Sequence, residues 1–262
     1  MQSTEESTRS KPCIHSSAPT HPLAPFPSNA SPANPAEVEA LFNRIAPVYD
    51  QLNHWLSLGQ HKAWKHMAVR WSNARQGHTC LDICCGSGDL TRMLAEATGP
   101  SGNVIGLDFA SEQLERAETI AYLKFGSDRI QWIHGDALSL PFEPNTFDAI
   151  TMGYGLRNVA DIDRALAEIW RVLKPGGTAA ILDFHKPQNQ QIWEFQTWCL
   201  DTIVVPLANR FDLYNEYAYI RPSLERFPQG PQQVNLAKAV GFVQPVHYAI
   251  AGGMMGILVA QK

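Results

Sequence analysis

The residues best suited to chemistry follow a short apolar run in LDICCGSGDLT, residues 81–91. In Gly86-Ser87-Gly88 the missing side chains let the backbone approach a ligand, and a helix that starts next would present free N–H groups to it. Thr91 stands where the dinucleotide fingerprint G-x-G-x-x-G has its third glycine, which disfavours a pyrophosphate site. The loop therefore indicates a nucleoside ligand of another kind.

Two acidic residues end the next apolar runs and extend this pattern. Asp108 follows Gly88 by 20 residues, where an acid can bind two ribose hydroxyls. Asp136, in GDALSLPF, comes after the third run, near the expected place of an adenine. Asp89 and Asp108 could also serve as helix caps. Taken together with the glycine loop, the acids predict a nucleoside pocket at the carboxyl edge of a sheet.

Strand and helix signals alternate along the chain and predict an α/β fold with a mostly parallel sheet covered on both faces. Two last runs around a Gly252-Gly253 turn predict a closing antiparallel hairpin, which gives seven strands. The expected strands are 79–84, 103–107, 130–134, 147–152, 178–183, 242–250 and 256–260, and the expected helices are 37–45, 60–71, 89–97, 111–123 and 161–173.

The N-terminal tail differs in composition from the rest of the chain. Its first 35 residues hold seven Pro and seven Ser and few large apolar side chains, which predicts disorder. We therefore expect a disordered tail over 1–36 and one domain over 37–262. A cleaved transit peptide is the alternative for the tail, although Glu5, Glu6 and the shortage of Arg oppose it.

The charge, the apolar runs and the cysteine content argue against a nucleic-acid partner, a membrane-spanning helix and a disulfide framework. A net charge of −4 supplies no basic field for nucleic acid. No apolar run is long enough for a spanning helix. Five cysteines, with no CxxC pair, favour a reducing compartment, and the adjacent Cys84 and Cys85 read as small, semi-buried residues.

Four segments resemble the class I methyltransferases and, among them, the ubiquinone/menaquinone biosynthesis C-methyltransferase family. They are FNRIAPVYDQLNHWLSLGQHKAW (42–64), DICCGSGDL (82–90), TMGYGLRNV (151–159) and RVLKPGGTAAILDF (171–184). The resemblance implies a Rossmann-like class I methyltransferase fold with N-terminal helices and a helical cap insertion. It implies S-adenosylmethionine as methyl donor without a metal, and C-methylation of a prenylated quinol. Two residues depart from the pattern, since Cys84 stands where glycine is usual and His185 where the family often has Ser.

The sequences of the segments TMGYGLRN and ICCGSGDL are most similar to those of the cyanobacterial and chloroplast branch, which methylates demethylphylloquinone. This implies a phytyl naphthoquinol as substrate and a place in the cytoplasm against a membrane, or in the chloroplast if the tail is a transit peptide. The residues implied to bind the donor are Asp82, Gly86, Ser87, Gly88, Asp108, Phe109, Asp136, Ala137 and Gly153.

The acceptor is expected beside Arg157, Asn158 and Tyr49. A ring carbon becomes nucleophilic when a neighbouring hydroxyl gives up its proton, and Arg157 can lower the pKa of that hydroxyl. Asn158 can orient the same oxygen, and Tyr49 can close over the pocket. A salt bridge for Arg157 and a helix cap for Asn158 are the alternatives. The histidines His54, His61 and His185 are weaker candidates for a base, because a lone histidine is more often a packing residue than a catalytic one.

The segment 184–230 breaks the strand–helix alternation and is rich in aromatic residues. Its apolar residues cover most of a helix that we expect to end before Pro206, and this surface is either core or a contact with the membrane. Other readings remain open: another quinol, another small-molecule methyltransferase, or a scaffold that only binds the donor. A short-chain NAD oxidoreductase is opposed by Thr91 and by the lack of a Tyr-x-x-x-Lys pair. The oligomeric state is left open.

Overall fold

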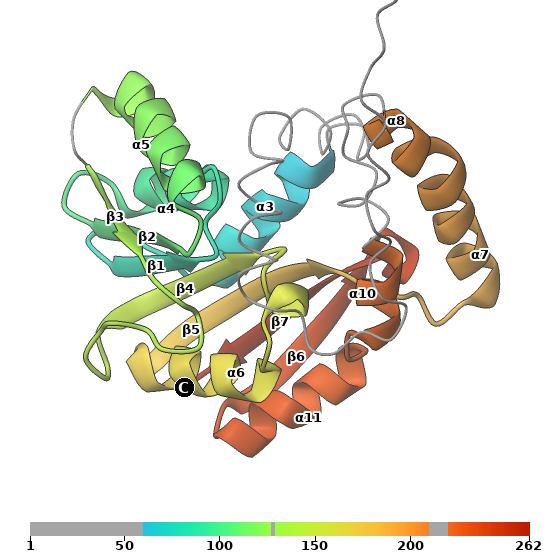
Figure 1. Cartoon of the computed structure of the whole chain (residues 1–262). Coiled ribbons are helices and arrows are strands. Elements are labelled where there is room, and N and C mark those ends of the chain that lie inside the picture. The colour runs from blue at the N-terminus through green and yellow to red at the C-terminus, as the bar shows by residue number, and fades with distance from the viewer. Residues whose placement is uncertain (1–59, 127–128, 210–219) are drawn as a thin grey trace, which may run out of the picture.

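The computed structural model describes residues 60–126, 129–209 and 220–262. Its centre is a seven-stranded sheet in the order β3-β2-β1-β4-β5-β7-β6 (Figure 1). All neighbouring strands are parallel except β7, which is antiparallel to β5 and to β6. The strands are β1 (Thr79–Ile83), β2 (Asn103–Asp108), β3 (Ile130–His134), β4 (Phe147–Gly153), β5 (Leu173–Phe184), β6 (Val243–Ile250) and β7 (Met255–Gln261). The predicted fold class and the antiparallel hairpin are confirmed.

Helices cover both faces of the sheet. One layer holds α3, α4 and α5, and the other holds α6 and α11 (Figure 1). The central strands read as continuous apolar runs because both of their faces are buried. These helices are α3 (Gln60–Trp71), α4 (Asp89–Thr98), α5 (Ser111–Phe125), α6 (Ile162–Val172) and α11 (Gly230–Val240).

Most element boundaries agree with the sequence pattern, and two differ for local reasons. The strand β5 starts at Leu173 rather than 178, because Leu173 already pairs with Phe147, and an irregularity that includes Gly176 at φ of 81° separates this pair from the regular pairing that begins at Thr178. The helix α6 is capped by Asp161, whose carboxylate accepts from the backbone N–H of Arg164 at 2.9 Å. Asn158 is therefore not the cap of this helix.

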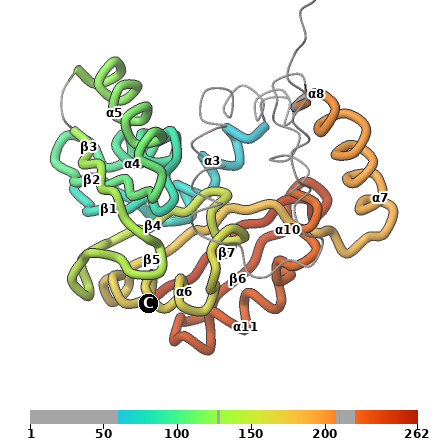
Figure 2. The backbone as a smooth tube through the Cα atoms, viewed as in Figure 1, coloured from blue at the N-terminus to red at the C-terminus, as the bar shows by residue number. Residues whose placement is uncertain are grey.

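The first part of the helical insertion, residues 190–209, lies to the side of the main layers (Figure 2). The insertion contains α7 (Gln190–Cys199), the π-helix η2 (Leu200–Val204), α8 (Val205–Asn209) and α10 (Ile220–Arg226). The expectation that the helix ends before Pro206 is wrong, because α8 runs past it to Asn209. In η2 the N–H of Val205 bonds to Leu200 O, five residues back. This wider turn relieves the clash that a proline makes with the carbonyl of the preceding turn.

Several expectations fall on residues 1–59, which the structure does not describe. They are the disordered tail over 1–36, the helix at 37–45, His54 and the role of Tyr49. Across the described residues, no helix is both long and apolar enough to span a bilayer.

Candidate active site

The glycine loop is fixed to the neighbouring strand by a buried carboxylate. Asp108, at the end of β2, accepts from the N–H of Gly86 at 2.8 Å and from the N–H of Ala110 at 2.9 Å. Burial raises the pKa of Asp108 above its ordinary value, although these backbone hydrogen bonds work in the opposite direction. The carboxylate keeps lone pairs for ligand hydroxyls, since each of its oxygens can accept more than one hydrogen bond.

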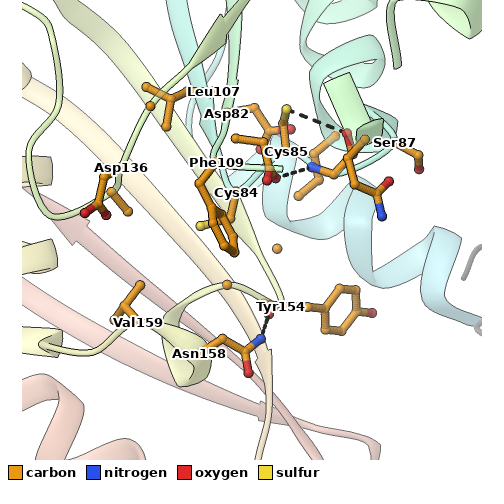
Figure 3. A pocket seen from close by; sticks show the side chains of 18 of the residues that line it. Asp82, Cys84, Cys85, Ser87, Leu107, Phe109, Asp136, Tyr154, Asn158 and Val159 are labelled. Atoms are coloured by element: carbon orange, nitrogen blue, oxygen red, sulfur yellow. Dashed lines mark hydrogen bonds between the residues drawn. The ribbon is translucent and has the colours of Figure 1, made fainter. Parts of the chain in front are cut away.

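A cavity of about 280 Å³ opens at the carboxyl ends of β1, β2 and β4 (Figure 3). This is the position at which open α/β sheets bind ligands. Nine of the predicted site residues line it: Asp82, Gly86, Ser87, Asp108, Phe109, Asp136, Ala137, Gly153 and Asn158. The structure thus brings together residues from four segments that lie far apart in the sequence.

Two predicted site residues do not line the cavity. Gly88 is the N-cap of α4 with φ of 80°, and a Cβ added there would lie 2.6 Å from the ring of Trp132. Its glycine is therefore required by backbone conformation and by packing. Arg157 is the second, and its guanidinium Nη1 lies 2.5 Å from Oδ1 of Asp183.

The loop after β4 is strained and held by its own side chains. Tyr154 has φ of 62°, a left-handed conformation that is uncommon for a bulky residue. Its carbonyl accepts from Arg157 Nη1 at 2.8 Å and from Asn158 Nδ2 at 2.9 Å. Cys84, in the facing loop after β1, is also left-handed at 53°, and its side chain packs against Gly155. Strain of this kind is typical of ligand-binding loops that the surrounding fold over-determines.

Asp82 is a fully buried acid at the base of the cavity. Its two oxygens accept from the hydroxyls of Thr91 at 2.6 Å and Thr151 at 2.7 Å. Burial raises its pKa to about 6 in spite of these bonds. A cationic ligand would stabilise the ionised form, so the site is suited to bind positive charge.

The match to known proteins agrees with this geometry. Residues 31–262 match the family model described as the ubiE/COQ5 methyltransferase family. The chain belongs to this family. The 2-phytyl-1,4-naphtoquinone methyltransferase of Trichormus variabilis is 58% identical over 226 residues, which cover 86% of this chain and 99% of the relative. The chloroplastic 2-phytyl-1,4-beta-naphthoquinone methyltransferase of Arabidopsis thaliana is 53% identical over 229 residues, covering 86% and 87%.

Solved structures show the same fold at lower identity. The SAM-dependent methyltransferase of Aquifex aeolicus has a TM-score of 0.57 at 17% identity, and the alignment covers 80% of this chain and 96% of that one. The class I methyltransferase fold implied by the sequence is therefore confirmed.

The predicted site lacked two charged residues that line the cavity of this methyltransferase, Lys65 and Asp89. Lys65, on α3, lines the cavity and its Nζ lies 2.6 Å from Oδ2 of Asp89. Asp89 itself is the first residue of α4 and not its cap, and its other oxygen pairs with Arg92. Burial acts to raise the pKa of Asp89, but the two cations outweigh it and the pKa lies below its ordinary value. A lysine on the buried face of this helix, with His61, Ala68 and Val69, was the available signal.

Two of the histidines considered as bases, His185 and His61, lie outside the cavity of this methyltransferase. His185 is buried outside the cavity, with Nδ1 3.0 Å from Asp183 O and Nε2 3.0 Å from Nε2 of His247. Burial lowers the pKa of His185 and raises that of the Cys84 thiol. His61 is buried on α3 and does not line the cavity. Within the described ranges no group of three or more His, Cys, Asp or Glu side chains is placed to hold a metal ion.

Proposed function

We propose that this protein transfers the methyl group of S-adenosylmethionine to a ring carbon of a prenylated quinol. The acceptor that we favour is 2-phytyl-1,4-naphthoquinol. The observation that carries the proposal is the identity of 51–58% to relatives named for the corresponding quinone, over 86–87% of the chain. A demethylmenaquinol or a benzoquinol is the alternative acceptor.

The donor is a sulfonium, and the cavity has the charge to receive it. Asp82, Asp108 and Asp136 contribute carboxylates, and the ring of Tyr154 offers an aromatic face. Asp108 would accept the ribose hydroxyls and Asp136 would lie at the adenine. Positive charge disappears from sulfur as the methyl leaves, and S-adenosylhomocysteine remains.

The acceptor ring must be reduced, because a quinone ring is too poor in electrons to attack a methyl group. Transfer of the hydroxyl proton to water directs electron density to the ring carbon, which takes the methyl as its bond to sulfur breaks. The carbon then gives up its own proton to water and the oxygen takes one back, which restores the aromatic quinol. Asn158, which lines the cavity, would orient the hydroxyl oxygen, and Tyr49 would close over the ring. Arg157 would act as a cation beside that oxygen, and in the described arrangement Asp183 balances its charge. To contact the acceptor, the guanidinium must donate to the substrate oxygen while it also donates to Asp183.

The phytyl tail suggests work at a membrane surface. Phe195, Trp198 and Ile203 are roughly half exposed on α7 and η2, and the rings of Phe195 and Trp198 stack at 6.3 Å. Because each buried methylene is worth about 0.8 kcal/mol, a long tail is best left in the bilayer while the ring enters the cavity. We therefore propose peripheral attachment through this surface, in a cyanobacterial cytoplasm or, if the tail 1–36 is a transit peptide, in a chloroplast.

The test is an assay of the purified protein with labelled donor and a panel of demethylated quinols, with products identified by mass spectrometry. We expect ring methylation of 2-phytyl-1,4-naphthoquinol and none of its oxidised form. A preference for a benzoquinol would shift the acceptor to the alternative, and labelling of no quinol would overturn the proposal. Arg157→Lys keeps the buried charge pair and should retain donor binding while turnover falls about tenfold or more, since the forked contacts are lost.

A further inference from the structure

A buried ammonium faces the cavity from the helix that precedes the glycine loop. Lys65 is only 7% exposed, on a face of α3 that it shares with Ala68 and Val69. Among the described residues that line the cavity, it is the one Lys or Arg. Lysine is rarely buried unless its charge is compensated.

Lys65 shares the carboxylate that it contacts with a second cation. Lys65 and Arg92 both pair with the single carboxylate of Asp89, so two positive charges face one negative charge. Arg92 also donates to Ser87 O at 2.6 Å, which directs it into the glycine loop. Among Lys65, Arg92 and Asp89 the excess is therefore one positive charge, and the next carboxylate of the cavity is Asp82, whose ionised form Lys65 also stabilises.

This excess lies at the end of the cavity where the donor's amino-acid part must lie. Asp136 and Asp108 follow β3 and β2, where adenine and ribose are expected, whereas Tyr154 follows β4. A donor laid along this edge therefore ends near Tyr154, and Nζ of Lys65 is 6.0 Å from the centre of that ring. The amino-acid part carries a carboxylate, for which a buried ammonium is a suitable partner.

We propose that Lys65 binds the α-carboxylate of S-adenosylmethionine, with Asp89 as a positioning residue that holds the ammonium. The proposal rests on the proposed function and assigns a subsite within it. It predicts selectivity for the carboxylate, which a purely structural lysine would not confer.

The test compares two donors that share the sulfonium nucleoside: S-adenosylmethionine and its decarboxylated form. Dissociation constants are measured by equilibrium dialysis for the full chain, for Lys65→Met, and for Lys62→Met as a matched control on the exposed side of α3. Lys65→Met should weaken S-adenosylmethionine about 10- to 100-fold and change the decarboxylated form by less than about threefold. Lys62→Met should change neither.

Equal weakening of both donors by Lys65→Met, or of neither, would overturn the proposal. The unsubstituted protein gives a second measure that needs no variant: it should prefer S-adenosylmethionine about tenfold or more, and equal affinity would overturn the assignment even if Lys65→Met does not fold. Failure of the unsubstituted protein to bind either donor would instead contradict the proposed function, so the two failures are distinguishable.

Discussion

Ionised Asp82 lowers the stability of the free protein and at the same time favours the binding of a cationic ligand. Its carboxyl is 0% exposed, and burial raises its pKa from 3.8 to about 6. A group whose pKa is higher in the folded protein stabilises the fold fully below its unfolded value, and this contribution is lost as the pH rises through 6. Above pH 6 the free enzyme therefore carries a buried negative charge that a cationic donor would offset.

Asp82→Asn should accordingly make the free protein more stable at pH 8, by up to about 3 kcal/mol. The gain should shrink as the pH falls from 6 toward 4, because the wild-type carboxyl is then protonated. Urea unfolding of both proteins at pH 8, 6 and 4.5 would measure this. A difference that does not change over this pH range would show that folding does not raise the pKa of Asp82. Donor affinity of the variant should fall at pH 8.

Gly88 contributes through packing as well as through backbone conformation. Gly88→Ala places a Cβ 2.6 Å from Trp132 at φ of 80°, and should lower the free energy of unfolding by about 2–4 kcal/mol. Gly126→Ala is the matched control, since Gly126 also has positive φ, 65°, but nothing lies within 4 Å of an added Cβ. It should cost only about 1 kcal/mol. Equal losses in thermal or urea unfolding would mean that Trp132 adapts.

At the scale of elements, the outer surface of α7 and η2 bears the proposed membrane contact. Trp193 is 8% exposed and packs beneath Lys186, so it belongs to the core side, whereas Trp198 is 54% exposed. Phe195→Ser with Trp198→Ser should therefore reduce co-sedimentation with phosphatidylcholine–phosphatidylglycerol vesicles several-fold. The unfolding temperature should change little, because exposed positions contribute little to stability.

Tyr122→Ser with Leu123→Ser provides the control, because these exposed residues lie on α5, in another part of the molecule. This pair should sediment like the unsubstituted protein. Equal sedimentation of the α7 variant and the unsubstituted protein would show that this surface does not bind the membrane.

The elements themselves could largely be predicted from the sequence because their signals are local. The helix over 60–71 and the strand over 130–134 have the predicted limits, since apolar periodicity and flanking turn residues act within each segment. The passage of α8 beyond Pro206 could not be predicted, because it depends on a π-turn that the proline pattern does not reveal.

The site residues also differ in whether a local sequence signal could predict them. The glycine loop and the two strand-end acids were found because each comes at the carboxyl end of a parallel strand, and these ends meet at one edge of the sheet. Lys65 was missed because its position follows from the packing of α3 on α4. Its partner Asp89 lies 24 residues further along the chain, so the contact does not show in the local sequence pattern. The salt bridge given as the alternative for Arg157 is present, but its partner Asp183 could not be predicted for a similar reason, as the pair joins β5 to the loop after β4.

For the molecule as a whole, the strand order determines where the ligands can meet. In β3-β2-β1-β4-β5-β7-β6 the chain reverses its direction of growth between β1 and β4, and the loops after these two strands part there. The cavity lies at this point, and its described lining carries four carboxylates, from Asp82, Asp89, Asp108 and Asp136, against the ammonium of Lys65. This distribution is complementary to a ligand with a sulfonium, an ammonium and a single carboxylate.

The most direct test of the account is calorimetric titration of the folded protein with S-adenosylhomocysteine and S-adenosylmethionine. We predict saturable one-to-one binding of both, and its loss in Asp108→Ala, since the ribose would lose its acceptor and the glycine loop its tie to β2. Absence of heat with either ligand on well-folded protein, or unchanged binding by Asp108→Ala, would contradict the assignment of this cavity to the methyl donor.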